Sequence, residues 1–205
     1  MKKGLSICIA ILALLSVVVQ YYLMLKNSSA SLWETSIRFF SFFTILSNSL
    51  VALYFISLSL KFFIPNKKAS FHFGLLTAIT VYITIVGLVY QLILRQTWSP
   101  TGLQKIVDEL LHSVNPVLVI LFWVLSIKTG KLRFSQISSW LIFPLVYLVY
   151  VLIRGQFSNF YPYPFLNIEI LGFNQVMINS LSITVMFVLI SALFVFIHIK
   201  ASNKK

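Results

Sequence analysis

Three kinds of side chain that can together perform acyl transfer occur inside apolar stretches of this chain. Thr44 lies in FFTILSN (residues 42–48), and Asp108 and His112 lie in DELLHSVNP (residues 108–116). A hydroxyl beside an imidazole that a carboxylate orients is the general arrangement of an activated nucleophile. The hypothesis is that Thr44 attacks, His112 takes its proton and Asp108 steadies the imidazole.

Helical spacing groups these residues with two asparagines. Thr44 and Asn48 are four residues apart and share one face of a helix. Asp108 and His112 have the same spacing, and Asn115 follows three residues later. The amide of Asn48 or Asn115 is a candidate donor to an oxyanion.

Pro116 disturbs the backbone next to the histidine. Proline has no backbone N–H, so the carbonyl of His112 loses its usual intrahelical donor, and a kink is expected at that turn. A free carbonyl and an imidazole would then lie in one place.

The composition identifies an integral membrane protein. The 205 residues are 59% hydrophobic and only 10% charged, whereas soluble domains carry about 25% charged residues. The apolar stretches are long enough to span a bilayer as helices. The sequence therefore predicts an all-α, polytopic protein whose single domain, 1–205, is a bundle of six helices at about 5–25, 37–60, 73–94, 110–127, 137–153 and 175–199.

The basic residues predict the orientation of this bundle. With six spans, 11 of the 16 lysines and arginines fall on the side that holds both termini, and all four acids fall on the other side. Positive residues favour the cytoplasmic side, so both termini are expected there. The net charge of +12 is thus a signal of topology and not of nucleic-acid binding.

This topology places the hydroxyl and the imidazole at similar depth. Thr44 follows Arg38 by six residues and His112 follows Asp108 by four. At 1.5 Å per residue, they lie about 9 Å and about 6 Å below those charges in the outer half of the membrane. The two helices are therefore expected to bring Thr44 and His112 together.

Arg154 and Tyr147, seven residues apart, share a face near the outer end of the fifth span. As an anchor, Arg154 would extend to the lipid headgroups. As a functional group, it would hold a substrate carboxylate or phosphate through paired hydrogen bonds. The sequence leaves both alternatives open.

Metal and cofactor chemistry finds no support in the sequence. There is no HExxH motif, no CxxC motif, no glycine-rich phosphate loop, and only one cysteine, Cys8. We expect no metal and no cofactor.

Packing offers a simpler explanation for the same polar residues. A threonine in a membrane helix usually bonds back to its own backbone or to a neighbouring helix. The Asp108–His112 pair is equally compatible with a structural role, although ionisable groups in spans are functional candidates by default.

Three motifs in their order along the chain resemble a known family. FFTILSN, DELLHSVNP and the segment from YVLIRG (150–155) to YPYPFLN (161–167), together with six spans, are similar to the androgen-induced-protein family with its ADTRP-like members, and to its short bacterial relatives. The resemblance implies an integral membrane threonine hydrolase of fatty acid esters of hydroxy fatty acids, in a bacterial cell membrane. On motif position, Thr44 matches the family's catalytic threonine and His112 its histidine.

The favoured hypothesis is therefore an intramembrane hydrolase of lipid esters, with lipid substrate and bilayer lipids as its partners. One alternative is a small transporter or lipid-binding protein without catalysis, since Pro116 and Pro144 are expected to break two helices. A second alternative is a structural or regulatory membrane protein, in which Thr44 and His112 would only pack.

Overall fold

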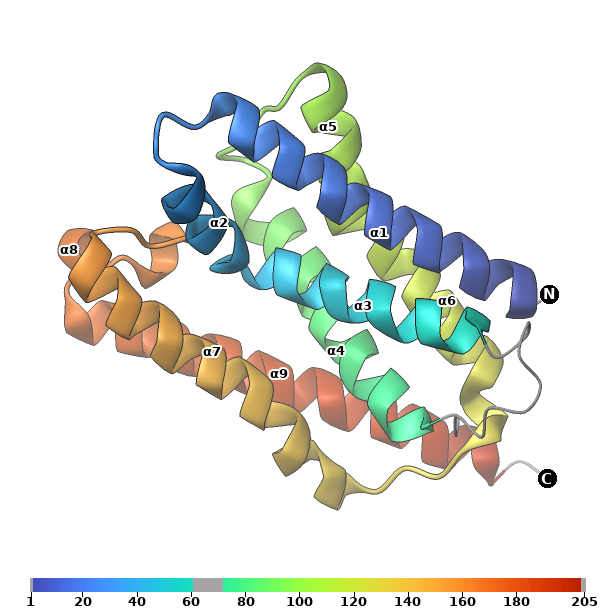
Figure 1. Cartoon of the computed structure of the whole chain (residues 1–205). Coiled ribbons are helices and arrows are strands. Elements are labelled where there is room, and N and C mark those ends of the chain that lie inside the picture. The colour runs from blue at the N-terminus through green and yellow to red at the C-terminus, as the bar shows by residue number, and fades with distance from the viewer. Residues whose placement is uncertain (1, 61–71, 204–205) are drawn as a thin grey trace.

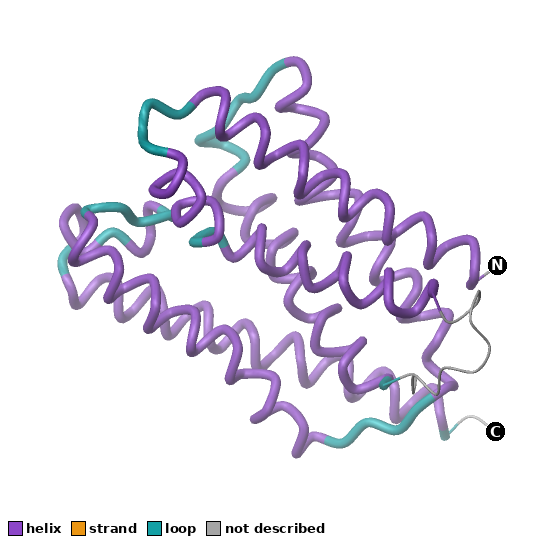
Figure 2. Tube along the Cα trace, in the orientation of Figure 1, coloured by secondary structure: helices purple, strands orange, loops and turns teal. Residues whose placement is uncertain are grey.

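The computed structural model describes residues 2–60 and 72–203, which form helices and loops with no strand among them (Figure 2). The basic loop IPNKKAS (64–70), with Lys61, and the last two lysines lie outside the described residues.

Within the described ranges, six helical segments are long and apolar enough to cross a membrane, which confirms the predicted all-α architecture. Their elements are α1 (Lys2–Asn27), α3 (Phe43–Leu60), α4 (Phe73–Val89) with η1 (Tyr90–Leu94), α5 (Gly102–Glu109) with η2 (Leu110–Val114) and α6 (Asn115–Ser126), α7 (Ile137–Ser158), and α9 (Phe173–Ser202). Shorter elements are α2 (Leu32–Phe40), η3 (Ile127–Thr129), η4 (Phe134–Gln136), η5 (Pro164–Leu166) and α8 (Ile168–Leu171).

The long helices form a bundle in which α1 lies along α3, and α4 lies among α3, α6 and α9 (Figure 1). Both ends of the chain lie at one end of the bundle, and α2 and α8 lie at the opposite end. An even number of spans produces this arrangement.

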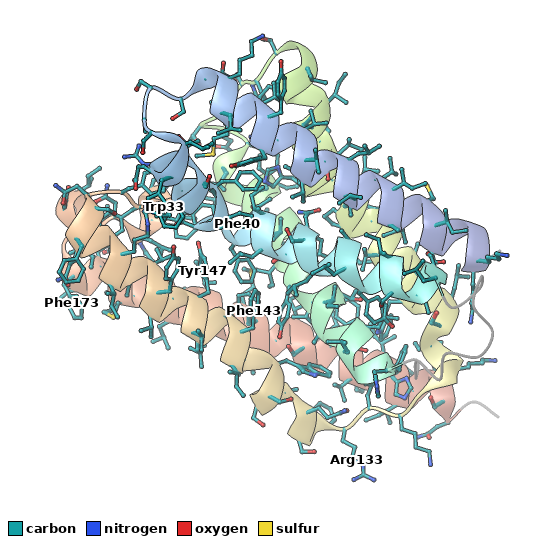
Figure 3. The ribbon with its side chains drawn as sticks, in the orientation of Figure 1. Trp33, Phe40, Arg133, Phe143, Tyr147 and Phe173 are labelled. Carbon is teal, nitrogen blue, oxygen red and sulfur yellow. The ribbon has the colours of Figure 1, made fainter. Side chains whose placement is uncertain are left out.

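Helix α7 runs beside α9 and reaches the rest of the bundle through large aromatic side chains (Figures 1 and 3). The Phe143 ring lies 5.4 Å from that of Phe43 and 5.0 Å from that of Tyr82, and the Tyr147 ring lies 5.0 Å from that of Phe43. Long side chains keep the α7 backbone apart from α3 and α4, and this separation leaves room for a cavity.

The second expected span, 37–60, was wrong at its start. Ser31 caps the separate helix α2, and Ser41 ends it by donating its hydroxyl to the carbonyl of Ile37. Serine competes for backbone hydrogen bonds in this way and favours helix ends. Arg38 therefore belongs to α2, and the membrane helix begins at Phe43.

Two other boundaries also differ from the prediction. The fourth segment begins at Gly102 and not at 110, so Asp108 lies within it. Helix α7 continues to Ser158, so Arg154 lies inside the helix, and Pro144 does not break it. The helix therefore ends later than the predicted 153. The chain leaves it at Asn159, which adopts the left-handed conformation that commonly follows a helix.

Candidate functional site

Thr44 is the second residue of α3, at the helix end where backbone N–H groups lack intrahelical partners. Its N–H donates to the hydroxyl of Tyr163 at 3.2 Å. The side chain is buried, with 8% of its surface exposed. The threonine hydroxyl therefore lies at the positive end of the helix dipole, where negative charge is stabilised.

Thr44 and His112 meet as the sequence predicted. The distance from Thr44 Oγ1 to His112 Nε2 is 3.4 Å. On the other side of the ring, Nδ1 lies 3.2 Å from Asp108 Oδ1 and 2.9 Å from the Asp108 carbonyl oxygen. Because both neighbours of Nδ1 are acceptors, Nδ1 carries the hydrogen and Nε2 offers its lone pair to Thr44.

Tyr90 completes the arrangement, and the sequence reasoning missed it. Its hydroxyl donates to Asp108 Oδ2, and its ring stacks on the imidazole of His112 with centroids 4.0 Å apart and planes 11° apart. The tyrosine thus fixes both the carboxylate and the plane of the imidazole. Its only signal in the sequence is a tyrosine near the end of a span, which is typical of an interfacial anchor.

Both residues of this stack lie in π-helical turns. Tyr90 begins η1 and His112 lies in the middle of η2. In η2 the N–H of Asn115 bonds to the carbonyl of Leu110, five residues earlier, just before Pro116. A π-turn, frequent at functional sites, therefore accommodates the proline where the sequence predicted a free carbonyl and a kink.

Tyr163 is the second residue that the sequence reasoning missed. It comes from the loop before η5, and its hydroxyl lies 3.3 Å from Thr44 Oγ1 as well as accepting from the Thr44 N–H. Burial raises the pKa of this hydroxyl above its ordinary value of 10.0, so it stays protonated at neutral pH. It can therefore donate its hydrogen to a group that binds beside Thr44.

The two asparagines lie next to the site but their amide hydrogens are occupied. Asn48 Nδ2 donates to the carbonyls of Thr44 and Leu111, and Asn115 Nδ2 donates to Asn48 Oδ1 and to Ser16 Oγ. Both side chains are fully buried. They join α1, α3 and α6 behind the Thr44–His112 pair, and neither is placed as an oxyanion donor.

Arg154 is held by a carboxylate of its own chain. Its Nη2 donates to Glu34 Oε1 at 3.0 Å, and Arg38 Nε donates to the same oxygen at 2.6 Å. Both guanidinium groups lie over the ring of Phe160, at 4.9 Å for Arg38 and 5.2 Å for Arg154. Two cations share one anion here, so the cluster keeps a net positive charge.

Tyr147 does not share a partner with Arg154. Its hydroxyl donates to the carbonyl of Ser41 at 2.8 Å, at the break between α2 and α3. This bond holds the backbone turn that precedes Thr44.

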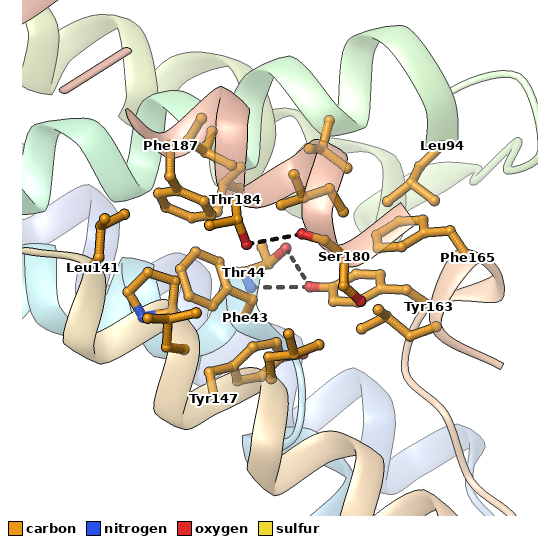
Figure 4. A pocket seen from close by; sticks show the side chains of 18 residues that line it. Phe43, Thr44, Leu94, Leu141, Tyr147, Tyr163, Phe165, Ser180, Thr184 and Phe187 are labelled. Atoms are coloured by element: carbon orange, nitrogen blue, oxygen red, sulfur yellow. Dashed lines mark hydrogen bonds between the residues drawn. The ribbon is translucent and has the colours of Figure 1, made fainter. Parts of the chain in front are cut away.

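Two cavities meet at Thr44. The outer cavity, of about 640 Å³, is lined by His112, Asp108, Tyr90 and Arg38 among others. The inner cavity, of about 80 Å³, lies among α3, α4, α7, α9 and the η5 loop, and its lining is mostly apolar (Figure 4). Thr44, Tyr163 and Leu94 line both cavities, whereas His112 lines only the outer one.

The described residues contain no cluster of three or more histidine, cysteine or acidic side chains suited to a metal ion. Compared with known proteins, the chain matches no family model, no curated protein and no solved structure. The resemblance drawn from the three sequence motifs therefore remains a prediction.

Proposed function

We propose that this protein is an intramembrane hydrolase of lipid esters that uses Thr44 as nucleophile and His112 as base. The observation that carries the proposal is the continuous chain of contacts from Tyr90 through Asp108 and His112 to Thr44, at a point where two cavities meet. If Thr44 served only to pack the helices, it would need neither a neighbouring base nor the two cavities.

In the proposed reaction, the hydroxyl of Thr44 attacks the ester carbonyl while Nε2 of His112 takes its proton. Asp108 stabilises the imidazolium that forms. The 3.4 Å separation of the two atoms is longer than a strong hydrogen bond, and the proton transfer requires them to approach more closely.

The negative charge that develops on the carbonyl oxygen needs donors beside Thr44. The hydroxyl of Tyr163 lies at that position, and the first turn of α3 adds the positive end of a helix dipole. Such prearranged donors typically supply the largest single part of catalysis. Tyr163 thus takes the role that the sequence had suggested for Asn48 or Asn115.

The substrate class follows from the cavities and from the resemblance. Fatty acid esters of hydroxy fatty acids, or similar lipid esters, combine apolar chains with a polar end. Arg38 lines the outer cavity and belongs to a cluster with excess positive charge. It is better placed than Arg154 to meet a substrate carboxylate.

We further propose that both termini face the cytoplasm of a bacterial cell and that the site opens toward the outer side. The distribution of lysine and arginine supports this orientation, and the site lies toward the end of the bundle opposite the termini. The water that completes hydrolysis then comes from the outer cavity.

Hydrolysis by the purified protein in nanodiscs tests this function. We expect turnover of lipid esters, and we expect Thr44→Ala and His112→Ala to lower kcat/KM by roughly 10³-fold or more. Ser47→Ala is the matched control, because Ser47 is a buried hydroxyl on the same helix that lines neither cavity. Lipid binding without turnover in the wild type would contradict the proposal and favour a lipid-binding protein.

A further inference from the structure

The two cavities are not equivalent with respect to the catalytic pair. Thr44 faces both of them, but His112 faces only the outer one. This asymmetry bears on how an ester must lie in the site, because its two halves react with different catalytic groups.

The base determines the side on which the alcohol leaves. After Thr44 Oγ1 bonds to the acyl carbon, the bond from that carbon to the alcohol oxygen breaks, and this oxygen takes the proton that His112 Nε2 holds. The alcohol oxygen must therefore lie within reach of Nε2, on the outer-cavity side. The acyl half, bonded to Thr44, extends the other way.

We propose that the inner cavity is an acyl-binding site and the outer cavity is the site of the alcohol half. The inference rests on the proposed function and deepens it. In the second half of the reaction, water from the outer cavity gives a proton to His112 and its oxygen to the acyl carbon. Thr44 Oγ1 leaves with that proton, and the products are a carboxylic acid and an alcohol.

The chemistry of the inner cavity suits a hydrocarbon chain. Its two hydroxyls from α9, Ser180 and Thr184, donate to the carbonyls of Val176 and Ser180 and so offer no free hydrogen (Figure 4). The rest of the lining is mainly aliphatic and aromatic. A hydrocarbon chain that enters this cavity leaves its surroundings of water or lipid and gains contacts with apolar side chains.

The size of the inner cavity limits the acyl half. At about 80 Å³, this cavity is much smaller than the outer cavity of about 640 Å³. Phe187 and Leu141 lie at the end of the cavity away from Tyr163 and Phe165 (Figure 4). These two side chains therefore limit the length of the acyl chain, and the shorter fatty acyl chains fit best. The alcohol half has the larger and more polar space.

Two series of esters test this assignment. The first varies the acyl half from butanoyl to stearoyl on p-nitrophenol, and the second varies the alcohol half from butanol to octadecanol on hexanoic acid. In nanodiscs, we expect kcat/KM of the wild type to fall with long acyl chains and to depend little on alcohol length. Phe187→Ala should improve stearoyl relative to butanoyl esters about tenfold and leave the alcohol series unchanged.

Leu141→Ala is the second variant at the same end of the inner cavity, in case Phe187→Ala folds poorly. Met24→Ala is the mirror variant, since Met24 lines only the outer cavity, and it should change the alcohol series alone. Leu181→Ala is the neutral control, because Leu181 is 63% exposed on α9.

The outcomes separate this inference from the proposed function. If no ester is cleaved by the wild type, the function itself fails. If esters are cleaved but Phe187→Ala and Leu141→Ala change the alcohol series, or neither series, the acyl assignment is overturned.

Discussion

At the residue scale, Tyr90 and Asp108 together hold the imidazole of His112, Tyr90 at the face of the ring and Asp108 at Nδ1. Tyr90 stacks on the ring and also donates to Asp108, which in turn accepts from Nδ1. In the proposed mechanism, Tyr90 is therefore a positioning residue for Nε2 of His112.

Replacing Tyr90 with Phe keeps the stacked ring and removes the hydroxyl that holds Asp108. We expect kcat to fall about tenfold while KM stays unchanged, because Tyr90 acts through the base and not on the ground-state substrate. Steady-state hydrolysis of a soluble ester measures both constants.

The matched control is Tyr82→Phe. Tyr82 is a buried tyrosine in the same spanning segment, 73–94, and its hydroxyl donates to the carbonyl of Trp140. Each substitution removes one buried hydrogen bond, worth about 1 kcal/mol of stability. Equal losses of kcat in the two variants would show that Tyr90 is only structural.

The sequence selected Thr44, His112 and Asp108 as candidates because polar groups are rare in apolar stretches and their spacing places them on helix faces. It did not identify Tyr90 or Tyr163. Tyrosine near a membrane surface is common, and only the tertiary fold brings the hydroxyl of Tyr163 from a distant loop to Thr44.

At the scale of elements, α4 packs closely against the turn that carries His112. Gly87 of α4 lies against the π-turn that carries His112: a Cβ atom at this glycine would be 3.2 Å from the His112 carbonyl oxygen and 3.4 Å from Pro116. A side chain at Gly87 must therefore push α4 and η2 apart.

Gly87→Leu should displace His112 from Thr44. We expect kcat/KM to fall by on the order of 10²-fold, since small misplacements cost that much, together with about 1–3 kcal/mol of stability from overpacking. Hydrolysis rates and thermal unfolding measure the two effects. Gly4→Leu is the control, because nothing lies within 4 Å of a Cβ atom there, and it should alter neither quantity appreciably.

The sequence predicted the number of spanning helices and the bounds of the third, 73–94, but not where the second and the fourth begin. Hydropathy does not distinguish α2 from α3, since FFSFF (39–43) continues the apolar run across the break at Ser41. The break matters for the site, because it places Thr44 at a helix N-terminus and not in mid-helix. Thr44 contacts His112 at the expected place, although Arg38, from which its depth was counted, belongs to α2.

At the scale of the whole molecule, Glu34 ties α2 to α7 at the end of the bundle opposite the termini. Hydrogen bonding from Arg38, together with the charge of Arg154, lowers the pKa of Glu34 below its ordinary value of 4.5. A carboxyl whose pKa is lowered in the folded state stabilises that state above its unfolded pKa, and this contribution is lost as the pH falls through the lowered value.

Glu34→Gln should therefore lower the Tm of the protein at neutral pH, and the difference from wild type should vanish in acid below the lowered pKa of Glu34. Thermal unfolding in nanodiscs over a pH series measures this. A difference that is constant with pH would show that the charge of Glu34 contributes nothing to the link between α2 and α7.

The proposed orientation also predicts which residues reagents can reach. With Cys8→Ser as background, Ser99→Cys in the loop before α5 should react with a membrane-impermeant maleimide on intact cells. Asn203→Cys, just after α9, should react only after permeabilisation. The reverse pattern would place the site on the cytoplasmic side.

The proposed function depends above all on Thr44 being a nucleophile that His112 activates. The most direct measurement is the reaction of the purified protein with a fluorophosphonate, with the modified residue located by mass spectrometry. We expect an adduct on Thr44 of the wild type and of Ser47→Ala, and none in Thr44→Ala or His112→Ala. A wild-type protein that stays unlabelled in detergent and in nanodiscs, or one labelled equally when His112 is absent, would contradict it.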